Sequence, residues 1–193
     1  MAGRLEVITG CMFSGKTEEL IRRVERARIA GQRVKLLKPQ LDYRYNENAV
    51  VTHYGREFHC DLLESGGENL RQLVDVVGEE ELTRSDLIVF DEGNFFQEGL
   101  VALAEELIKA DKRVIVAGLD LTFAGEPFHP MPELMAKADR LDKLHAVCTC
   151  CGETATRTQR LIDGEPAPAD DEVIKVGGMG DYEARCRDCW ELG

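Results

Sequence analysis

The order of apolar and polar residues along the chain predicts alternating strands and helices. Runs rich in Val, Ile and Leu predict strands at residues 4–9, 33–37, 87–90 and 114–118. Apolar residues spaced three or four apart predict helices at residues 16–30, 69–77, 100–110 and 132–138. Because strands that alternate with helices are typical of parallel sheets with right-handed crossovers, we expect an α/β fold.

This regular alternation is interrupted in two places. Residues 40–66 are polar and rich in turn-forming residues, with a short β-like piece around Val50. Near residue 147 the strand–helix pattern gives way to cysteine pairs and to loops rich in Gly and Pro. We therefore expect two units, a larger one at residues 1–147 and a smaller one at residues 148–193.

Composition and charge narrow the classes of function. The chain has 193 residues, 44% of them hydrophobic, and a formal net charge of −12. Proteins that bind nucleic acid through its phosphates need a basic surface, so we expect no nucleic acid partner. No apolar run reaches the roughly 18 to 20 residues that cross a bilayer, and the first residues do not resemble a signal peptide. We expect a cytoplasmic protein with no membrane partner.

A glycine-rich segment at residues 10–17 fits the P-loop pattern G-x-x-x-x-G-K-[ST] at every defined position. It also lies between a predicted strand and a predicted helix, as a P-loop does. The glycines let backbone N–H groups point at phosphate oxygens, and the helix N-terminus adds its partial positive charge. Lys16 can reach the β- and γ-phosphates of ATP, and the Thr17 hydroxyl can bind Mg²⁺.

Two acidic residues, Asp91 and Glu92, end the apolar run at residues 87–90. In P-loop proteins, an acidic residue at this place holds Mg²⁺, which we expect of Asp91 together with Thr17. Glu92 can then position water for ATP hydrolysis, or it can accept a proton from the hydroxyl of an acceptor. The two carboxylates therefore predict nucleotide chemistry without identifying the acceptor.

Five of the seven cysteines lie near the C-terminus, where Cys148, Cys151, Cys186 and Cys189 form two C-x-x-C pairs. Two such pairs supply the four thiolates of a closed, structural Zn²⁺ site, and a redox-active pair is the alternative. The pairs are 34 residues apart, and this long loop either closes over a small ligand or is a solvated excursion. We expect Cys11 to be an ordinary small residue.

The chain resembles the type II (cellular-type) thymidine kinases over nearly its whole length. The resemblance is carried by residues 12–20, 91–96, 118–120, 158–161 and 182–186, by Phe123 and residues 127–128, and by the cysteine pairs. It implies a P-loop (RecA-like) parallel sheet flanked by helices, with a small C-terminal zinc ribbon that carries a substrate-covering "lasso" loop. It also implies a homotetramer that is inhibited by thymidine triphosphate.

The same resemblance implies transfer of the ATP γ-phosphoryl group to the 5′-hydroxyl of thymidine, and of deoxyuridine, in nucleoside salvage. Glu92 matches the general base, Lys16 the phosphate lysine, and Arg44 an arginine that assists near the transferring phosphate. The expected ATP site comprises Thr9, Gly10, Cys11, Met12, Phe13, Ser14, Gly15, Lys16, Thr17, Asp91, Glu92, Gly93 and Asn94. The expected thymidine site comprises Phe95, Leu119, Phe123, Phe128, Thr158, Ile174, Val176 and Tyr182.

Two other functions are compatible with parts of the pattern. A P-loop ATPase with a nucleic-acid-binding zinc ribbon would use the same phosphate site, but the net charge of −12 argues against it. A nucleotide-binding regulatory module without catalysis would not depend on Glu92. An assay of ATP consumption against several nucleosides separates these alternatives.

Overall fold

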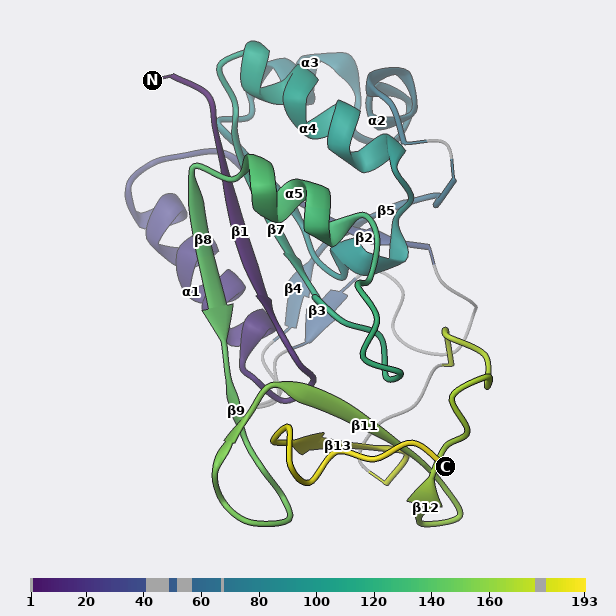
Figure 1. The fold of residues 1–193 in the computed structure, drawn as a ribbon. Coiled ribbons are helices and arrows are strands. Elements are labelled where there is room, and N and C mark those ends of the chain that lie inside the picture. The colour runs from purple at the N-terminus through teal and green to yellow at the C-terminus, as the bar shows by residue number, and fades with distance from the viewer. Residues whose placement is uncertain (1, 41–48, 52–56, 67, 176–179) are drawn as a thin grey trace.

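The central element of the computed structural model is a six-stranded sheet whose paired strands run parallel to one another (Figure 1). The structure describes residues 2–40, 49–51, 57–66, 68–175 and 180–193. The strand order is β5-β2-β6-β7-β1-β8. These strands are β1 (Arg4–Gly10), β2 (Val34–Pro39), β5 (Asp61–Leu63), β6 (Leu87–Phe90), β7 (Arg113–Gly118) and β8 (Arg140–Leu144).

Helices cover both faces of the sheet, and alternate strand residues pack against them. On β6, Ile88 and Phe90 belong to one apolar cluster, whereas Leu87 and Val89 belong to the other. Packed on the second cluster is α1 (Lys16–Ile29). The first cluster is covered by α2 (Leu70–Val77), α3 (Glu79–Arg84), α4 (Gly99–Lys109) and α5 (Met131–Lys137). This arrangement explains the uninterrupted apolar runs, because both faces of the central strands are buried.

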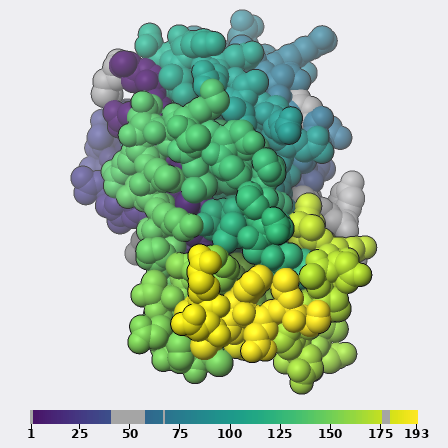
Figure 2. All heavy atoms as spheres, in the orientation of Figure 1, coloured from purple at the N-terminus to yellow at the C-terminus, as the bar shows by residue number. Residues whose placement is uncertain are grey.

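The described residues of the C-terminal region, 146–175 and 180–193, lie beyond the carboxyl end of β1 (Figure 1). Figure 2 shows the last residues of the chain, in yellow, at the lower end of the molecule. The short antiparallel strands of this region are β9 (Ala146–Val147), β10 (Thr154–Ala155), β11 (Arg157–Ile162), β12 (Glu165–Pro166) and β13 (Tyr182–Arg185).

A separate pair is formed by β3 (Ala49–Val51) and β4 (Glu57–His59). None of the helices in the described part of the chain is long and apolar enough to cross a membrane.

The expected parallel sheet with flanking helices is confirmed, and the expected helices and strands are present with ends that differ by one or two residues. The sequence pattern missed β8, an edge strand whose residues are mostly exposed. It also missed α3, because a six-residue helix rich in glutamate has almost no apolar periodicity. The strands of the C-terminal region were missed for a similar reason, since all five are only two to six residues long.

A buried ion network fixes α1 on the sheet. Arg23 of α1 is 4% exposed and donates to the carboxylates of Glu6 on β1 at 3.0 Å and Asp142 on β8 at 2.8 Å. Arg113 on β7 donates to Glu6 at 2.7 and 3.0 Å. Burial alone would raise the pKa of Glu6, but the neighbouring arginines lower it below its ordinary value. The last two residues of the P-loop pattern, Lys16 and Thr17, form the start of α1. The ion network therefore also fixes this end of the P-loop on the sheet.

Candidate active site

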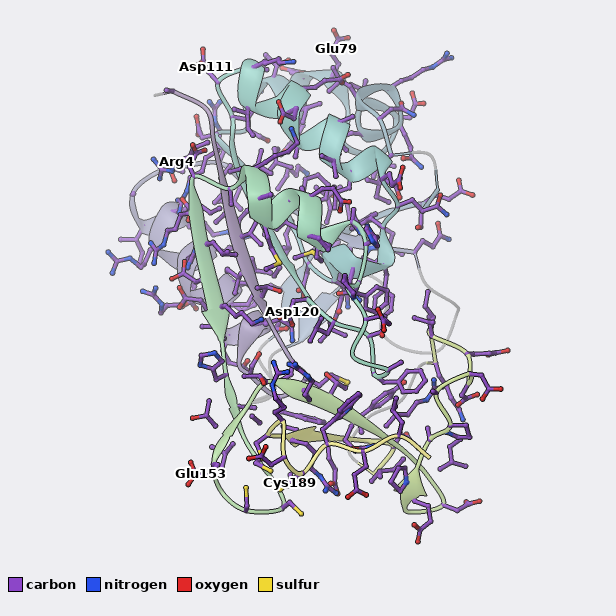
Figure 3. All side chains as sticks on the ribbon, viewed as in Figure 1. Arg4, Glu79, Asp111, Asp120, Glu153 and Cys189 are labelled. Carbon is purple, nitrogen blue, oxygen red and sulfur yellow. The ribbon has the colours of Figure 1, made fainter. Side chains whose placement is uncertain are left out.

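The predicted phosphate-binding residues gather at the carboxyl edge of the sheet. The P-loop follows β1 and Asp91 follows β6, while β7 lies between these two strands. In parallel α/β sheets this edge is where ligands bind. Asp120, just after β7, is buried there and pairs with Lys143 at 2.6 Å. Figure 3 shows Asp120 between the sheet and the C-terminal region, which contains Cys189.

The P-loop adopts a conformation that depends on its glycines. Gly10 has a φ of 143°, and a Cβ atom there would lie 2.3 Å from the carbonyl oxygen of Leu144. Gly15 has a φ of 82° and precedes the first turn of α1, which includes Thr17. Phe13 also has a positive φ, 63°, although its side chain is 44% exposed. A bulky residue held in this region stores strain, a feature that concentrates at ligand-binding loops.

Side chains of the P-loop turn inward onto its own backbone. The carbonyl oxygen of Cys11 accepts hydrogen bonds from Lys16 Nζ and from Ser14 Oγ, both at 2.8 Å. Burial lowers the pKa of the Lys16 ammonium, whereas the nearby carboxylates of Glu92 and Asp91 act in the opposite direction. Lys16 is thus held against the P-loop backbone, and its ammonium group lies near the carboxylates of Asp91 and Glu92. Just before the loop on β1, Thr9 Oγ1 donates to the carbonyl of Gly118 on the neighbouring strand β7 at 2.9 Å.

Asp91 and Glu92 have different environments although they are adjacent. Asp91 is 4% exposed, and its Oδ1 accepts a hydrogen bond from the Glu92 backbone N–H at 3.0 Å. Burial, and then the neighbouring Glu92 carboxylate, raise the pKa of Asp91 to about 7. Glu92 is partly exposed and has a left-handed φ of 55°. One carboxyl group is therefore buried among charges, which suits a cation ligand, while the other projects from a strained turn.

The turn after Glu92 is fastened to the end of β7. It contains the short 3₁₀ helix η1 (Gly93–Phe95). The side-chain Oδ1 of Asn94 accepts a hydrogen bond from the Leu119 backbone N–H at 2.8 Å. A Cβ atom at Gly93 would lie 2.5 Å from the Cγ1 atom of Val116, so this turn packs directly on the sheet. Asn94 thereby ties the acidic turn to a residue of the expected thymidine site.

A short hairpin between β7 and α5 carries two of the predicted aromatic residues and contacts a third. An isolated bridge joins Leu121 and Pro127, so that Phe123 and Phe128 lie on one compact turn. Phe123 is 4% exposed and Phe128 9% exposed. The Phe128 ring meets the Phe95 ring edge to face, with centroids 5.8 Å apart. The Phe95 and Phe128 rings are therefore in contact, and Phe123 lies on the same hairpin as Phe128.

The C-terminal region contacts the P-loop directly. The Met12 backbone N–H donates to Thr158 Oγ1 on β11 at 3.1 Å. Cys11 is 3% exposed and lies in a small cluster with Cys148, Cys186 and two alanines, and its thiol donates to the Ala155 carbonyl at 3.5 Å. Burial raises the pKa of the Cys11 thiol. Cys11 is thus a small buried residue, as expected, and it also forms the contact between the phosphate loop and the cysteine region.

Two further predicted thymidine residues, Tyr182 and Ile174, lie on β13 and in the segment that ends at residue 175. Tyr182 is 8% exposed, and its hydroxyl donates to the Lys175 carbonyl at 2.8 Å. Ile174 is 48% exposed in the adjoining segment. Arg44 and Val176, both part of the expected site, lie outside the residues that the structure describes.

The four paired cysteines form one cluster. The sulfur atoms of Cys148, Cys151, Cys186 and Cys189 all lie within 4.8 Å of one another. Cys151 and Cys186 have their sulfurs 3.7 Å apart, close to the about 3.8 Å that tetrahedral geometry gives for metal–sulfur bonds of about 2.3 Å. Desolvation opposes ionisation of Cys148, but backbone N–H groups in the cluster lower its pKa to about 6. Four converging thiols of this kind fit a tetrahedral metal site.

Two residues that contact this site, Arg160 and Trp190, had no role predicted from the sequence. Arg160 is fully buried, and its guanidinium lies against the rings of Phe123 and Tyr182. Trp190 donates from Nε1 to the Phe123 carbonyl at 3.1 Å and packs against Gly125. The sequence offered one signal, the position of the single tryptophan directly after Cys189. The burial of the polar residues 158–160 is visible in the structure alone.

Comparison with known proteins agrees with this arrangement. A family model described as thymidine kinase matches residues 3–190. A thymidine kinase of Halobacterium salinarum is 47% identical over 188 residues, which cover 97% of this chain and 94% of the relative. One from Haloquadratum walsbyi is 42% identical, with 97% and 95% covered. A solved structure of the Legionella pneumophila ATPase DotB aligns with a TM-score of 0.40 and 16% identity over 71% of this chain and 35% of that one, too little to support an argument. From the family match and these two relatives it follows that the chain belongs to the thymidine kinase family.

Proposed function

We propose that this protein transfers the γ-phosphoryl group of ATP to the 5′-hydroxyl of thymidine, and also of deoxyuridine, in the salvage of DNA precursors. The observation that carries the proposal is the match of nearly the whole chain to the thymidine kinase family. The geometry supports it, because the P-loop, the Asp91–Glu92 pair and an aromatic hairpin share one edge of the sheet. A kinase needs these three elements: a phosphate cradle, a base and an acceptor pocket.

The ATP phosphates would bind the backbone N–H groups of residues 10–17, with Lys16 against the β- and γ-phosphates. The Thr17 hydroxyl and the buried Asp91 carboxylate would hold Mg²⁺, whose donor set of oxygens they match. When bound, Mg²⁺ neutralises charge on the phosphates. Thr9, Gly93 and Asn94 would complete this half of the site by fixing the strand end and the acidic turn.

The acceptor half of the site would depend on Glu92 and the aromatic hairpin. Glu92 would accept the proton of the 5′-hydroxyl as that oxygen attacks the γ-phosphorus, and ADP would leave. Arg44 would assist near the transferring phosphate. The thymine base would lie among the aromatic residues and be read at its edge by backbone groups. Its contacts would be Phe95, Leu119, Phe123, Phe128, Thr158, Ile174, Val176 and Tyr182.

The C-terminal unit, residues 148–193, would act as a zinc ribbon whose lasso loop covers the nucleoside. Closure of such a loop excludes water from the phosphoryl group and so suppresses ATP hydrolysis. The unit would be distinct from the kinase unit at residues 1–147 but would dock on it through contacts such as that of Met12 with Thr158. A zinc ion held by four thiolates has no open position, so its role would be structural.

Zinc removal provides a test of this structural role. We expect purified protein to contain one zinc per chain, and Cys186→Ser to abolish that zinc. Loss of about 3 kcal/mol of metal-linked stability would lower Tm by about 6–12 °C in a chain of this size. The matched control is Cys150→Ser, since Cys150 is exposed and outside the four-sulfur group. Elemental analysis and thermal melting give the result; equally stable, metal-free wild-type protein would refute the idea.

The family resemblance also leads us to propose a cytoplasmic homotetramer that thymidine triphosphate inhibits. Sizing chromatography with light scattering measures the first property. A steady-state assay with added thymidine triphosphate measures the inhibition. Excess thymidine should relieve this inhibition if thymidine triphosphate occupies the thymidine site.

The proposed activity is tested by measuring ATP consumption and nucleoside monophosphate formation with thymidine, deoxyuridine, deoxycytidine and deoxyadenosine. We expect one ADP per thymidine monophosphate, a similar result with deoxyuridine, and little product with the other two. Single-stranded DNA is added in a parallel series. ATP hydrolysis that DNA stimulates, without a phosphorylated nucleoside, would replace the proposal with a nucleic-acid-dependent ATPase.

A further inference from the structure

Arg160 lies at the point where three segments of the proposed nucleoside site meet. It belongs to β11, and its side chain is 1% exposed. We propose that Arg160 is a positioning residue that holds the Phe123 ring, the Tyr182 ring and residues 171–175 in one arrangement. It thereby sets the affinity for the nucleoside and not the affinity for ATP. This inference rests on the proposed function, because that function makes Phe123 and Tyr182 contacts of the base.

The first set of contacts is with the two aromatic rings. The guanidinium carbon of Arg160 lies 4.9 Å from the Phe123 ring centroid and 5.8 Å from that of Tyr182. Both distances are within the range of a cation–π interaction, which is strongest when the partners are shielded from water as these are. One planar cation thus orients two rings that come from different parts of the chain.

The second set of contacts is with the segment after Pro168. Nη1 of Arg160 donates to the Glu172 carbonyl and lies 3.5 Å from Asp171 Oδ2. Tyr182, the cross-strand neighbour of Arg160, holds the same segment through its hydroxyl bond to Lys175. Ile174, an expected base contact, lies between these two anchoring points. Displacement of Arg160 would therefore release the segment and both rings together.

The burial of this charge argues against a role in packing alone. Nη2 of Arg160 is buried and has no hydrogen-bond partner among the residues that the structure describes, which exclude residues 176–179 of the nearby segment. A buried guanidinium with incomplete hydrogen bonding is costly, and an apolar side chain of similar volume would fill the space with a smaller desolvation penalty. What an apolar side chain cannot supply is the combination of a bond to the Glu172 carbonyl and attraction to two rings.

The same strand offers a way to separate a local effect from a general one. Thr158, two residues before Arg160, contacts the P-loop through Met12. If a substitution at Arg160 displaced the whole strand, binding of ATP would weaken as much as binding of the nucleoside. If Arg160 acts only on the rings and on residues 171–175, binding of ATP would be preserved.

The experiment compares Arg160→Met, Arg160→Lys and the matched control Arg157→Met by steady-state kinetics of the full-length protein. Arg157 lies on the same strand, and among the described residues its guanidinium donates to the neighbouring Thr156. We expect Arg160→Met to raise the KM for thymidine at least tenfold and to change the KM for ATP less than twofold. Arg160→Lys retains the charge and should restore part of the affinity, whereas Arg157→Met should change neither KM by more than twofold.

A second readout does not require catalysis. Trp190 is the only tryptophan and is bonded to the Phe123 carbonyl, so its fluorescence reports on the aromatic hairpin. Without ligands, we expect the emission maximum to shift in Arg160→Met and not in Arg157→Met. An unchanged KM for thymidine together with unchanged emission would overturn the role of Arg160, as would an equal rise in both KM values. If Arg160→Met does not fold, Arg160→Lys provides the same comparison.

The outcome for Arg160 is distinguishable from the outcome for the proposed function. Wild-type protein that phosphorylates no thymidine refutes the function, yet the emission of Trp190 still shows whether Arg160 orders the hairpin. Wild-type protein that is active, with an Arg160→Met variant indistinguishable from it, refutes only the role of Arg160.

Discussion

Replacement of Glu92 by Gln is expected to lower kcat by about 10²- to 10⁴-fold, the range for loss of a general acid or base. The amide has nearly the same shape as the carboxylate, but it cannot accept the proton of the 5′-hydroxyl. Gln should adopt the left-handed backbone conformation of this position, with its φ of 55°, as readily as Glu does. The substitution should therefore leave the turn folded. The KM values for ATP and thymidine should therefore change only a few-fold. Steady-state assays of thymidine monophosphate formation measure all three constants.

The matched control for this substitution is Glu98→Gln. Glu98 is exposed at the start of α4 and follows the acidic turn by only six residues. We expect it to retain wild-type kinetics. A Glu92→Gln enzyme that keeps more than a tenth of wild-type kcat would show that another group accepts the proton.

Replacement of Lys16 by Met should lower kcat by about 10²- to 10³-fold, a typical loss when one charged or hydrogen-bonding group is removed from a transition state. Lys16 is already held at the P-loop by its bond to the Cys11 carbonyl, so little reorganisation is needed before it meets a phosphate. Binding of ATP should also weaken, as measured by calorimetry. Lys137→Met is the control, because Lys137 pairs with Glu105 at an exposed position. Comparable losses in both variants would contradict the assignment.

The sequence predicted the parts of the fold in which each element has its own local signal. The strands β6 and β7 were predicted because burial on both faces requires continuous apolar runs. The P-loop was predicted because phosphate binding requires glycine and lysine at fixed spacing. The four-cysteine cluster was likewise predicted, since two C-x-x-C pairs are sufficient to indicate a metal site.

Contacts between distant segments could not be predicted in this way. The bond from Met12 to Thr158 spans 146 positions, and nothing local to either residue indicates it. Arg160 is another example, because a charged residue in a short strand is usually exposed, whereas here it is buried against two rings. The family resemblance identified the neighbourhood of Arg160 but not its contacts.

Backbone strain marks two residues of the proposed site. Phe13 in the P-loop and Glu92 after β6 both have a positive φ, which is rare for residues other than glycine. Each such conformation costs about 1–3 kcal/mol and persists only where the surrounding structure fixes it. Around Glu92, that support comes from the bond between Asn94 and Leu119 and from the close packing of Gly93 on Val116. The strained positions are thus supported by neighbours that the sequence alone did not relate to one another.

The most direct test of the proposed activity is the fate of the γ-phosphoryl group in the presence of thymidine. Labelled ATP is incubated with wild-type protein and either thymidine or 5′-deoxythymidine, which lacks only the proposed acceptor hydroxyl. If the proposed activity is correct, label appears in thymidine 5′-monophosphate with thymidine, and no labelled nucleoside monophosphate forms with 5′-deoxythymidine. Label found only in inorganic phosphate with both compounds would contradict it.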